Sequence, residues 1–185
     1  MIIRAAGEAD VAAVAAIYGH HALHGLGTFE EEAPSAADMA ARIAQITALG
    51  LPYLVADDGG VIIGFAYAAP FRPRAAYRYT VEDSVYVAPG CAGRGVGKAL
   101  VQRLIEICQG MGLRQMMAVI GDSGNAASIG LHRALGFEPA GVCRSVGFKH
   151  GRWVDTVWMH RALNDGDASA PSAAGLRPRR RRGSG

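Results

Sequence analysis

A glycine-rich turn between a strand pattern and a helix pattern is the feature that most constrains the fold of this chain. The turn lies in the segment CAGRGVGKAL, residues 91–100. The residues before it, 79–88, alternate apolar and polar side chains, and those after Gly95 carry apolar side chains at helical spacing. A strand, a glycine turn and a helix start in this order direct backbone N–H groups at an anion, usually a phosphate.

Two common nucleotide-binding motifs do not match this segment. A P-loop requires G-x-x-x-x-G-K-[ST], but Ala92 stands at the first glycine and Ala99 at the hydroxyl position. The dinucleotide motif G-x-G-x-x-G also fails, because Lys98 or Leu100 stands where the third glycine is required. The sequence therefore argues against a nucleoside triphosphatase and against a dinucleotide-binding domain.

Length and composition indicate one globular domain in a reducing compartment. The chain has 185 residues, half of them apolar. Its longest apolar run, 61–71, is interrupted and too short to span a membrane, and the first residues lack the layout of a signal peptide. Cys91, Cys108 and Cys143 are scattered and read as free thiols. We expect a cytoplasmic protein without a membrane partner.

The composition changes after Leu163. Residues 164–185 contain no aromatic residue and close on the run RPRRRR, so they cannot bury enough apolar surface to order themselves. The arginine run could contact nucleic acid, but no basic patch elsewhere supports that function. The sequence predicts a folded domain over 1–163 and a disordered, arginine-rich tail over 164–185.

The remaining patterns predict a fold that combines helices and strands. Two amphipathic helices come first, and hairpins with turn residues at their tips lie near the middle and at the end. The predicted elements are helices over 7–23, 35–50, 95–110 and 125–136, hairpins over 53–68 and 140–163, and strands over 79–88 and 114–120. This order is that of an α/β (α+β) protein.

Three stretches together resemble the GCN5-related N-acetyltransferases over residues 1 to about 163. Gly95 and Gly97 keep two positions of the family's Q/R-x-x-G-x-G/A turn, although Ala92 replaces the first. Asn125 matches the coenzyme-binding asparagine, and LHRALGF at 131–137 matches the following helix. The resemblance implies a mixed central sheet with a splayed strand pair, flanked by about four helices. It also implies acetyl-coenzyme A as co-substrate and no metal.

A narrower resemblance is to the branch that acetylates phosphinothricin, methionine sulfoximine and methionine sulfone. It rests on TVEDSVYV at 80–87, His132 in place of the usual tyrosine, and VGFKHGRWVDTVWM at 146–159. The resemblance implies direct acetyl transfer to the amine of a small amino-acid analogue. The alternatives are a protein N-terminus or another amine as acceptor, and a coenzyme A-binding regulator without catalysis. A homodimer also remains open.

The chemistry of the residues and the family resemblance together assign binding residues to both substrates. A bulge in the strand before the turn would free backbone groups for the coenzyme, and arginines after the preceding strand would bind an acidic acceptor. The coenzyme residues are Val85, Tyr86, Val87, Gly93, Arg94, Gly95, Val96, Gly97, Lys98, Asn125 and Ser128. The acceptor residues are Phe29, Arg72, Arg74, Ala75, Ala76 and Tyr77.

Two titratable residues are the catalytic candidates. Glu82 is the candidate general base, because a carboxylate on a central strand is costly to bury without a function or a partner. Asp83 competes with it, and the sequence does not decide which one points into the cleft. His132 stands where the family has a thiolate-protonating tyrosine and could act as acid, as base relay or structurally. The histidine cluster at 20–24 is too loose for zinc.

Overall fold

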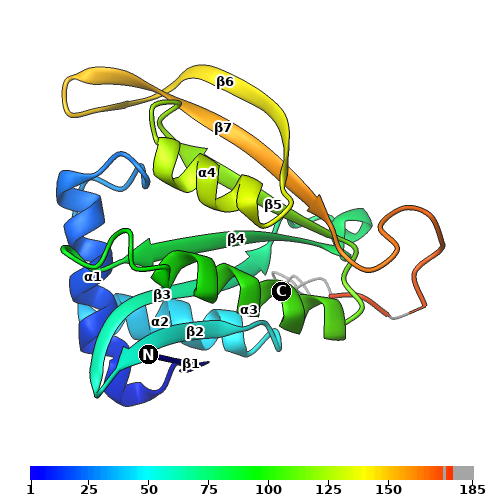
Figure 1. Ribbon diagram of the computed structural model, residues 1–185, viewed down its shortest axis with the longest axis horizontal. Coiled ribbons are helices and arrows are strands. Elements are labelled where there is room, and N and C mark those ends of the chain that lie inside the picture. Colours follow the sequence, from blue (N-terminus) through cyan, green and yellow to red (C-terminus); the bar gives the residue numbers. More distant parts are fainter. Residues whose placement is uncertain (173, 177–185) are drawn as a thin grey trace, which may run out of the picture.

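The protein forms one seven-stranded mixed sheet with helices on both faces. The computed structural model describes residues 1–172 and 174–176. The strands follow the order β1-β2-β3-β4-β5-β7-β6 (Figure 1). The strands are β1 (Ile2–Ala5), β2 (Tyr53–Asp58), β3 (Val61–Pro70), β4 (Thr80–Val87), β5 (Gln115–Gly121), β6 (Glu138–Lys149) and β7 (Arg152–Ala162). The helices are α1 (Val11–His24), α2 (Ala36–Thr47), α3 (Val96–Gly110) and α4 (Ala126–Ala134), with short 3-10 turns at Glu8–Asp10 and Ala75–Tyr77.

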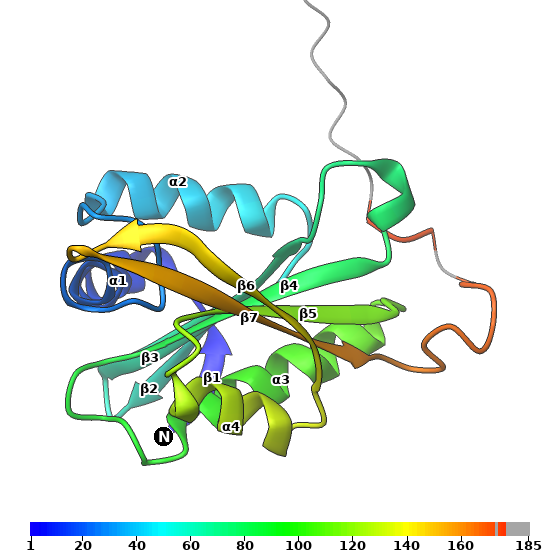
Figure 2. The same ribbon diagram turned by 90° about the horizontal axis from the view of Figure 1, so that it is seen from above.

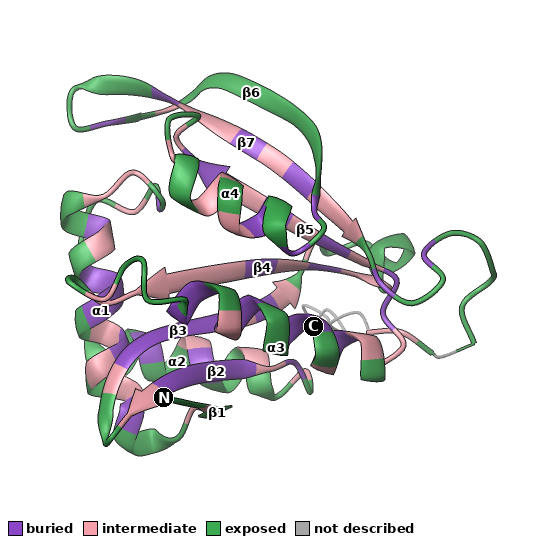
Figure 3. Cartoon of the chain, viewed as in Figure 1, coloured by how far each residue is buried: buried purple, intermediate pink, exposed green. Residues whose placement is uncertain are grey.

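The sheet separates two apolar cores. Seen from above, α1 and α2 cover one face of the sheet and α3 and α4 cover the other (Figure 2). Successive side chains of a strand point to opposite faces, so Phe65 packs with the α1 and α2 residues while its neighbour Ala66 packs under α3. Burial on both faces explains why β2 and β3 are apolar almost throughout, whereas β6 is exposed along most of its length (Figure 3).

Most predicted elements are confirmed, including the α/β fold with a mixed sheet and four α-helices. The exception is β1, which the sequence analysis missed. Its four residues are too few to show an alternating pattern, and three of them are exposed. The strand forms because Ile2–Ala5 pair with the edge of β2. Within residues 1–172 and 174–176, no helix is long and apolar enough to cross a membrane.

The start of α2 shows how local sequence sets a helix boundary. Ser35 caps the helix, since its hydroxyl accepts a hydrogen bond of 3.1 Å from the Asp38 N–H. The Asp38 carboxylate in turn accepts a 3.0 Å hydrogen bond from the Ser35 N–H. This reciprocal pair satisfies two donors that the first helical turn would leave unpaired. The cap therefore ends the connection from α1 at a defined residue.

Strands β4 and β5 are parallel and pair along only part of their length. Their register runs from Thr80 and Gln115 to Asp83 and Ala118. Beyond that point β4 stays paired with β3, and β5 stays paired with β7. The family resemblance implied a bulge in β4, but its pairing with β3 runs from Val81 to Val87 without a register shift. The two strands separate because their own pairing ends, and the edge of β4 beyond Asp83 faces an opening.

Residues 164–172 and 174–176 belong to the tail predicted over 164–185, and several of them contact the end of the sheet. The Arg114 side chain, 11% exposed, donates hydrogen bonds to the Ser169 carbonyl at 3.0 Å and to its hydroxyl at 2.7 Å. Farther along, the Leu176 N–H donates to the carbonyl of Arg78 at 2.7 Å. The red end of the trace accordingly reaches the Ala75–Tyr77 turn in Figure 2. The arginine run lies outside the described residues.

Shortening the chain tests the contribution of this segment to stability. Ending the chain after Asn164 would leave the Arg114 guanidinium buried without its Ser169 partners. We expect this to lower the free energy of unfolding by about 1–3 kcal/mol, the usual cost of an unsatisfied buried donor. Urea denaturation measures the change, with a chain ended after Leu176 as the control. Equal stability of both shortened chains would mean that the segment contributes nothing to the fold.

Candidate functional site

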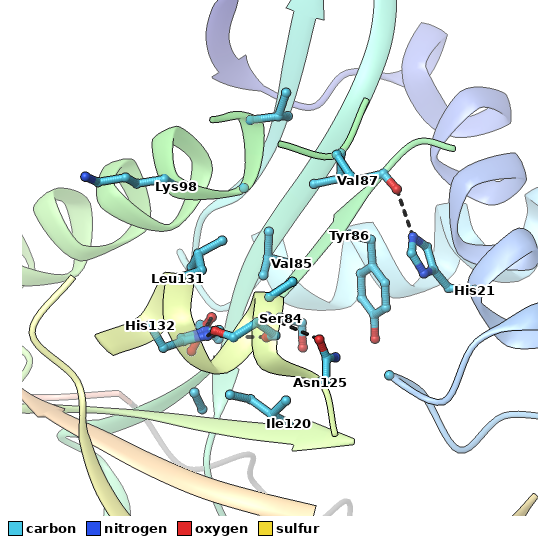
Figure 4. Close-up of a pocket in the computed structure, with 18 of the residues that line it drawn as sticks. His21, Ser84, Val85, Tyr86, Val87, Lys98, Ile120, Asn125, Leu131 and His132 are labelled. Atoms are coloured by element: carbon cyan, nitrogen blue, oxygen red, sulfur yellow. Dashed lines mark hydrogen bonds and ion pairs between the residues drawn. The ribbon is translucent and has the colours of Figure 1, made fainter. Parts of the chain in front are cut away.

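A pocket of about 510 Å³ opens where β4 and β5 separate. Its walls are the second half of β4, the glycine turn, the end of β5 and the start of α4 (Figure 4). Gly27, in the loop after α1, closes one side. The predicted coenzyme and catalytic residues that line it are Val85, Tyr86, Val87, Gly93, Gly95, Val96, Gly97, Lys98, Asn125, Ser128 and His132. One pocket thus brings together residues from 85 to 132.

The glycines of the turn serve two different purposes. Gly93 and Gly95 have φ angles of 76° and 80°, which only glycine adopts without strain. Gly95 is the N-cap of α3, so the unpaired N–H groups and the positive end of the helix dipole lie at the pocket. At Gly97, by contrast, a Cβ would lie 2.7 Å from the Leu131 side chain. Gly97 lines the pocket, as predicted, and its missing side chain also allows α3 and α4 to approach each other.

Two predicted coenzyme contacts are engaged within the protein. Arg94 forms an ion pair of 2.8 Å with Asp58 and does not line the pocket. The carbonyl of Val87 accepts a hydrogen bond from His21 Nε2 at 2.8 Å, so it is not the free group that the resemblance implied (Figure 4). Burial lowers the pKa of His21, which favours the neutral imidazole with its proton on Nε2.

His21 was predicted only as part of a loose histidine cluster. The rings of His20 and His24 lie 5.0 Å apart, while His21 turns toward Tyr86 and the pocket. In the part of the chain that the structure describes, no three His, Cys, Asp or Glu side chains are grouped to hold a metal ion. The sequence spacing of His20, His21 and His24 on one helix did not indicate that His21 lines the pocket, because the position of His21 there depends on its contact with the distant strand β4.

Asp83 and His132 form a buried pair at the inner wall of the pocket. His132 Nε2 lies 3.0 Å from Asp83 Oδ2, and the two side chains are 3% and 1% exposed. The other ring nitrogen, Nδ1, lies 2.8 Å from the Ser128 carbonyl oxygen. The edge of Phe137 packs against the ring, with centroids 5.0 Å apart. Asp83 stands between Val81 and Val85 on the otherwise apolar side of the strand, and its partner on α4 explains why a carboxyl group is buried there.

The protonation state of His132 follows from its two partners. A carbonyl oxygen only accepts hydrogen bonds, so Nδ1 carries a proton. Nε2 faces a carboxyl oxygen of Asp83, so the protonated ring, which donates from both nitrogens, fits these two partners best. Burial alone lowers the pKa of His132, but the hydrogen bond and charge of Asp83 outweigh it and raise that pKa above its usual value. Asp83 Oδ1 has no hydrogen-bond partner among the described residues, although it is buried.

Glu82 points to the opposite face of β4, toward α1 and α2. Its neighbours across the sheet are Ala69 on β3 and Met117 on β5. Burial raises the pKa of the Glu82 carboxyl, the nearby charge of Arg72 lowers it, and Asp83 raises it further. The net pKa lies above the usual value for a glutamate. The two adjacent carboxylates are thus separated by the sheet, and only Asp83 lines the pocket between β4 and β5.

The predicted acceptor residues lie on the Glu82 side of the sheet or beside it. The Arg72 guanidinium lies 4.4 Å from the ring centre of Phe71 and 5.5 Å from that of Trp158. Sequence reasoning did not single out Trp158, because a tryptophan in a strand is also a common packing residue. Arg72, Arg74, Ala75 and Tyr77 line a second pocket of about 380 Å³, together with Leu176; Ala76 does not line it.

Phe29 lies away from that second pocket. Its ring packs against Gly147 of β6, where a Cβ would collide with it. The side chain is 39% exposed. The structure therefore brings the predicted coenzyme residues into one pocket, with Arg94 outside it, but divides the predicted acceptor residues between the loop after β3 and the β6 side of the sheet.

Comparison with known proteins gives a consistent set of similarities. Residues 15–137 match the acetyltransferase (GNAT) family. Phosphinothricin N-acetyltransferase of Alcaligenes faecalis is 53% identical over 169 residues, covering 91% of this chain and 86% of the relative. L-methionine sulfoximine/L-methionine sulfone acetyltransferase of Salmonella typhimurium is 39% identical over 173 residues, which cover 94% of this chain and 99% of the relative.

A solved structure is similar over almost the whole chain. It is the crystal structure of a GNAT superfamily phosphinothricin acetyltransferase from Sinorhizobium meliloti in complex with AcCoA. The two chains are 48% identical with a TM-score of 0.91, and the match covers 94% of each. The family match spans β4, the glycine turn, β5 and α4, so it includes the main walls of the pocket.

Replacing Asp83 tests the buried pair. Asp83→Asn should lower the pKa of His132, measured by NMR titration of the ring, because the raising charge is gone. Because the pKa of His132 is higher in the folded than in the unfolded protein, protonation of this ring stabilises the fold. This stabilisation is complete below the unfolded-state pKa of about 6.5 and is lost as the pH rises through the folded-state pKa. We therefore expect the variant's loss of stability, about 1–3 kcal/mol, to be larger near about pH 6 than near about pH 9.

The matched control is Glu82→Gln, which removes the neighbouring carboxylate on the other face. It should leave the titration of His132 almost unchanged, since Asp83 is the carboxylate within hydrogen-bond distance. A His132 pKa that responds equally to both substitutions would show that the pair does not control the ring.

Proposed function

The chain belongs to the acetyltransferase (GNAT) family, with acetyl-coenzyme A as its co-substrate, and we propose that it acetylates the amine of a small amino-acid analogue. Phosphinothricin, methionine sulfoximine and methionine sulfone are the acceptors of this class. The transfer is direct, with both substrates bound together. The observation that carries the proposal is the pair of adjacent carboxylates, Glu82 and Asp83, directed to opposite faces of β4 where it leaves β5.

The opening between β4 and β5 suits the coenzyme. The N-terminal amides of α3 after Gly95 form a cradle for the pyrophosphate, and Lys98 adds a positive charge at its rim. The N–H and C=O of Val85 point away from β3, because the backbone groups of alternate residues such as Ala88 pair with β3, and β5 no longer pairs at this position, which leaves the Val85 groups for an extended chain of amides. The same edge offers a donor to the thioester oxygen.

Glu82 is the proposed general base. An amine attacks a thioester only after it has lost a proton, and a base works best when its pKa approaches the working pH. Burial moves the pKa of Glu82 in that direction. Glu82 also faces the side of the sheet that carries Arg72, where the acceptor would bind. The competing assignment, Asp83, is engaged with His132 on the other side.

The Asp83–His132 pair is the proposed source of the proton for the departing thiolate. Both nitrogens of His132 are engaged, so the ring does not present a free N–H to the pocket. Asp83 lines the pocket and shares its other oxygen with the ring. The protonated ring of His132, which itself lines the pocket, is therefore the proposed acid: one ring nitrogen exchanges its present partner and gives its proton to the thiolate sulfur, and the neutral ring keeps its hydrogen bond to the other partner.

Two further properties belong to the proposal. The β6–β7 hairpin exposes Val142, Val146, Phe148 and Trp153, of which Phe148 and Trp153 lie with their rings 5.4 Å apart, and exposed apolar side chains favour association with a second copy of the chain. A particle with the mass of one chain in solution would contradict this dimer.

The free cysteines at 91, 108 and 143 are compatible with a reducing compartment such as the cytoplasm.

A coupled assay of coenzyme A release tests the function. The acceptors are phosphinothricin, methionine sulfoximine and methionine sulfone, set against a simple aliphatic amine and a short peptide with a free N-terminus. Turnover of the three amino-acid analogues supports the proposal. Turnover of the peptide or the plain amine alone would favour the broader amine acetyltransferase, and coenzyme binding without any turnover would favour a regulator.

Arg72 gives the first prediction from this function. Its guanidinium suits a carboxylate or phosphinate of the acceptor, and charge-assisted hydrogen bonds contribute about 1.5–3 kcal/mol. Arg72→Ala should therefore lower kcat/KM for the acidic acceptors about tenfold to a hundredfold, with coenzyme affinity unchanged. Arg103→Ala is the control, because Arg103 lies on the surface of α3, pairs with Glu106 at 2.9 Å and lines neither pocket. Equal effects of the two substitutions would remove Arg72 from the acceptor site.

The second prediction from this function concerns Glu82. Glu82→Gln should lower kcat about a hundredfold or more while coenzyme binding stays the same, as expected when a general base is lost. In the unchanged protein, kcat/KM should fall as pH drops through the raised pKa of Glu82, because the protonated carboxyl no longer accepts a proton. The variant should lose this acid limb. If Asp83→Asn removes the limb and Glu82→Gln keeps it, Asp83 is the base.

A further inference from the structure

Asp155, near the start of β7, is a carboxylate that the proposed chemistry does not use. It directly precedes Thr156, which pairs with Gly121 at the end of β5. Its side chain is 20% exposed and accepts a hydrogen bond on each oxygen. The Ser145 N–H of β6 donates to Oδ1 at 2.8 Å, and the Ser123 hydroxyl donates to Oδ2 at 2.8 Å. Asp155 therefore joins β7 to β6 on one side and to the connection between β5 and α4 on the other.

These two hydrogen bonds favour the ionised form of Asp155. The bond from Ser145, and after it the bond from Ser123, holds the pKa of the carboxyl below its usual value. At neutral pH both oxygens therefore act as acceptors only. A hydroxyl bonds more strongly to a charged carboxylate than to a neutral acceptor. Asp155 is thus suited to hold the Ser123 side chain in one place.

Residues 122–124 form the turn that Asp155 holds, and β7 supports this turn at further points. Within the turn, the Asp122 carboxylate accepts a hydrogen bond from the Gly124 N–H at 3.1 Å. Asp122 has a φ of 70°, in the left-handed region that is costly for residues other than glycine. Its N–H donates to the Asp155 carbonyl at 2.9 Å, and its carboxylate pairs with Arg152 at 2.9 Å. The conformation of the turn therefore depends on contacts with β7.

The turn joins two residues that line the pocket, Gly121 and Asn125. Asn125 caps α4, since its side-chain oxygen accepts a 3.1 Å hydrogen bond from the Ser128 N–H. The Asn125 N–H in turn donates to the carbonyl of Asp122 at 3.0 Å. Figure 4 shows Asn125 and His132, both from this part of the chain, beside the pocket. A shift of the turn would therefore move the cap and, with it, the wall that α4 gives to the pocket.

We propose that Asp155 is a positioning residue for the coenzyme: through Ser123 it holds the turn at 122–124, and so it fixes Asn125 and the first turn of α4 as a wall of the pocket. This inference rests on the proposed function, in which that pocket holds acetyl-coenzyme A. Asp155 does not itself line the pocket, so its effect on the coenzyme passes through the turn. Arg72, proposed for the acceptor, lines the other pocket, and none of its lining residues belongs to the turn.

Binding of coenzyme A, measured by isothermal titration calorimetry, tests the proposal without any acceptor. Ser123 is exposed, and Ser123→Ala removes only the bond to the turn while the bond from Ser145 stays. We expect the Kd of coenzyme A to rise about threefold to tenfold in Ser123→Ala and in Asp155→Ala, the effect of losing one partly exposed hydrogen bond. The double variant should bind as Asp155→Ala does, because the same bond cannot be lost twice.

Steady-state kinetics separate positioning from a merely structural role. Ser123→Ala should raise the KM of acetyl-coenzyme A by about the same factor and change the KM of the acceptor less than about twofold. A merely structural role would lower the amount of active protein and leave both KM values unchanged. Glu138→Gln is the matched control, because it removes an exposed carboxylate of the same hairpin and should leave both KM values and the Kd unchanged.

Either of two results would overturn the proposal. One is a Kd of coenzyme A that stays unchanged in folded Ser123→Ala and Asp155→Ala proteins, and the other is a double variant in which the two effects add. The proposed function fails on different evidence, namely an unchanged protein that does not bind coenzyme A or does not turn over the acceptor panel. The two hypotheses therefore fail separately.

Discussion

The site depends on one interruption in the hydrogen bonding of the sheet. β4 and β5 pair from Thr80 and Gln115 to Asp83 and Ala118, and there the pairing ends. If it continued, the backbone groups of Val85 would be used within the sheet, and the pocket between the strands would close. Each strand keeps its other neighbour, so the opening costs no loss of order in β4 or β5. The glycine turn and α3 then lie at the mouth of this opening.

The same interruption fixes where charge is buried. Asp83 stands at the last paired position of β4, and its burial is compensated by His132 on α4. Because α4 begins at Asn125, whose side chain accepts a hydrogen bond from the Ser128 N–H, the first turn of that helix is held in place. The Ser128 carbonyl then orients the His132 ring from the other side. Strand, cap and ring form one continuous set of polar contacts.

The sequence predicted those parts of the protein that depend on neighbouring residues. The helices, the two hairpins and the glycine turn follow from periodicity and from residues such as Ser35 and Asn125, whose caps are local. The missed contacts join residues far apart in sequence: His21 with Val87, Asp83 with His132, and Lys149 with Thr28. A pattern of single residues cannot show which two surfaces meet. The coenzyme-binding role predicted for Asn125, unlike its cap, came from the resemblance of the surrounding motifs to a family.

Alternation along β4 has a consequence for how such a site can change over evolutionary time. Glu82 and Asp83 are adjacent in sequence but belong to different layers of the protein, one facing α1 and α2 and the other facing α4. Mutations that reshape the surroundings of Arg72 and Trp158 alter one layer and leave the other intact. Substitutions on the Arg72 side of the sheet can therefore change which acceptor is bound, while the residues on the side that faces α4 stay the same.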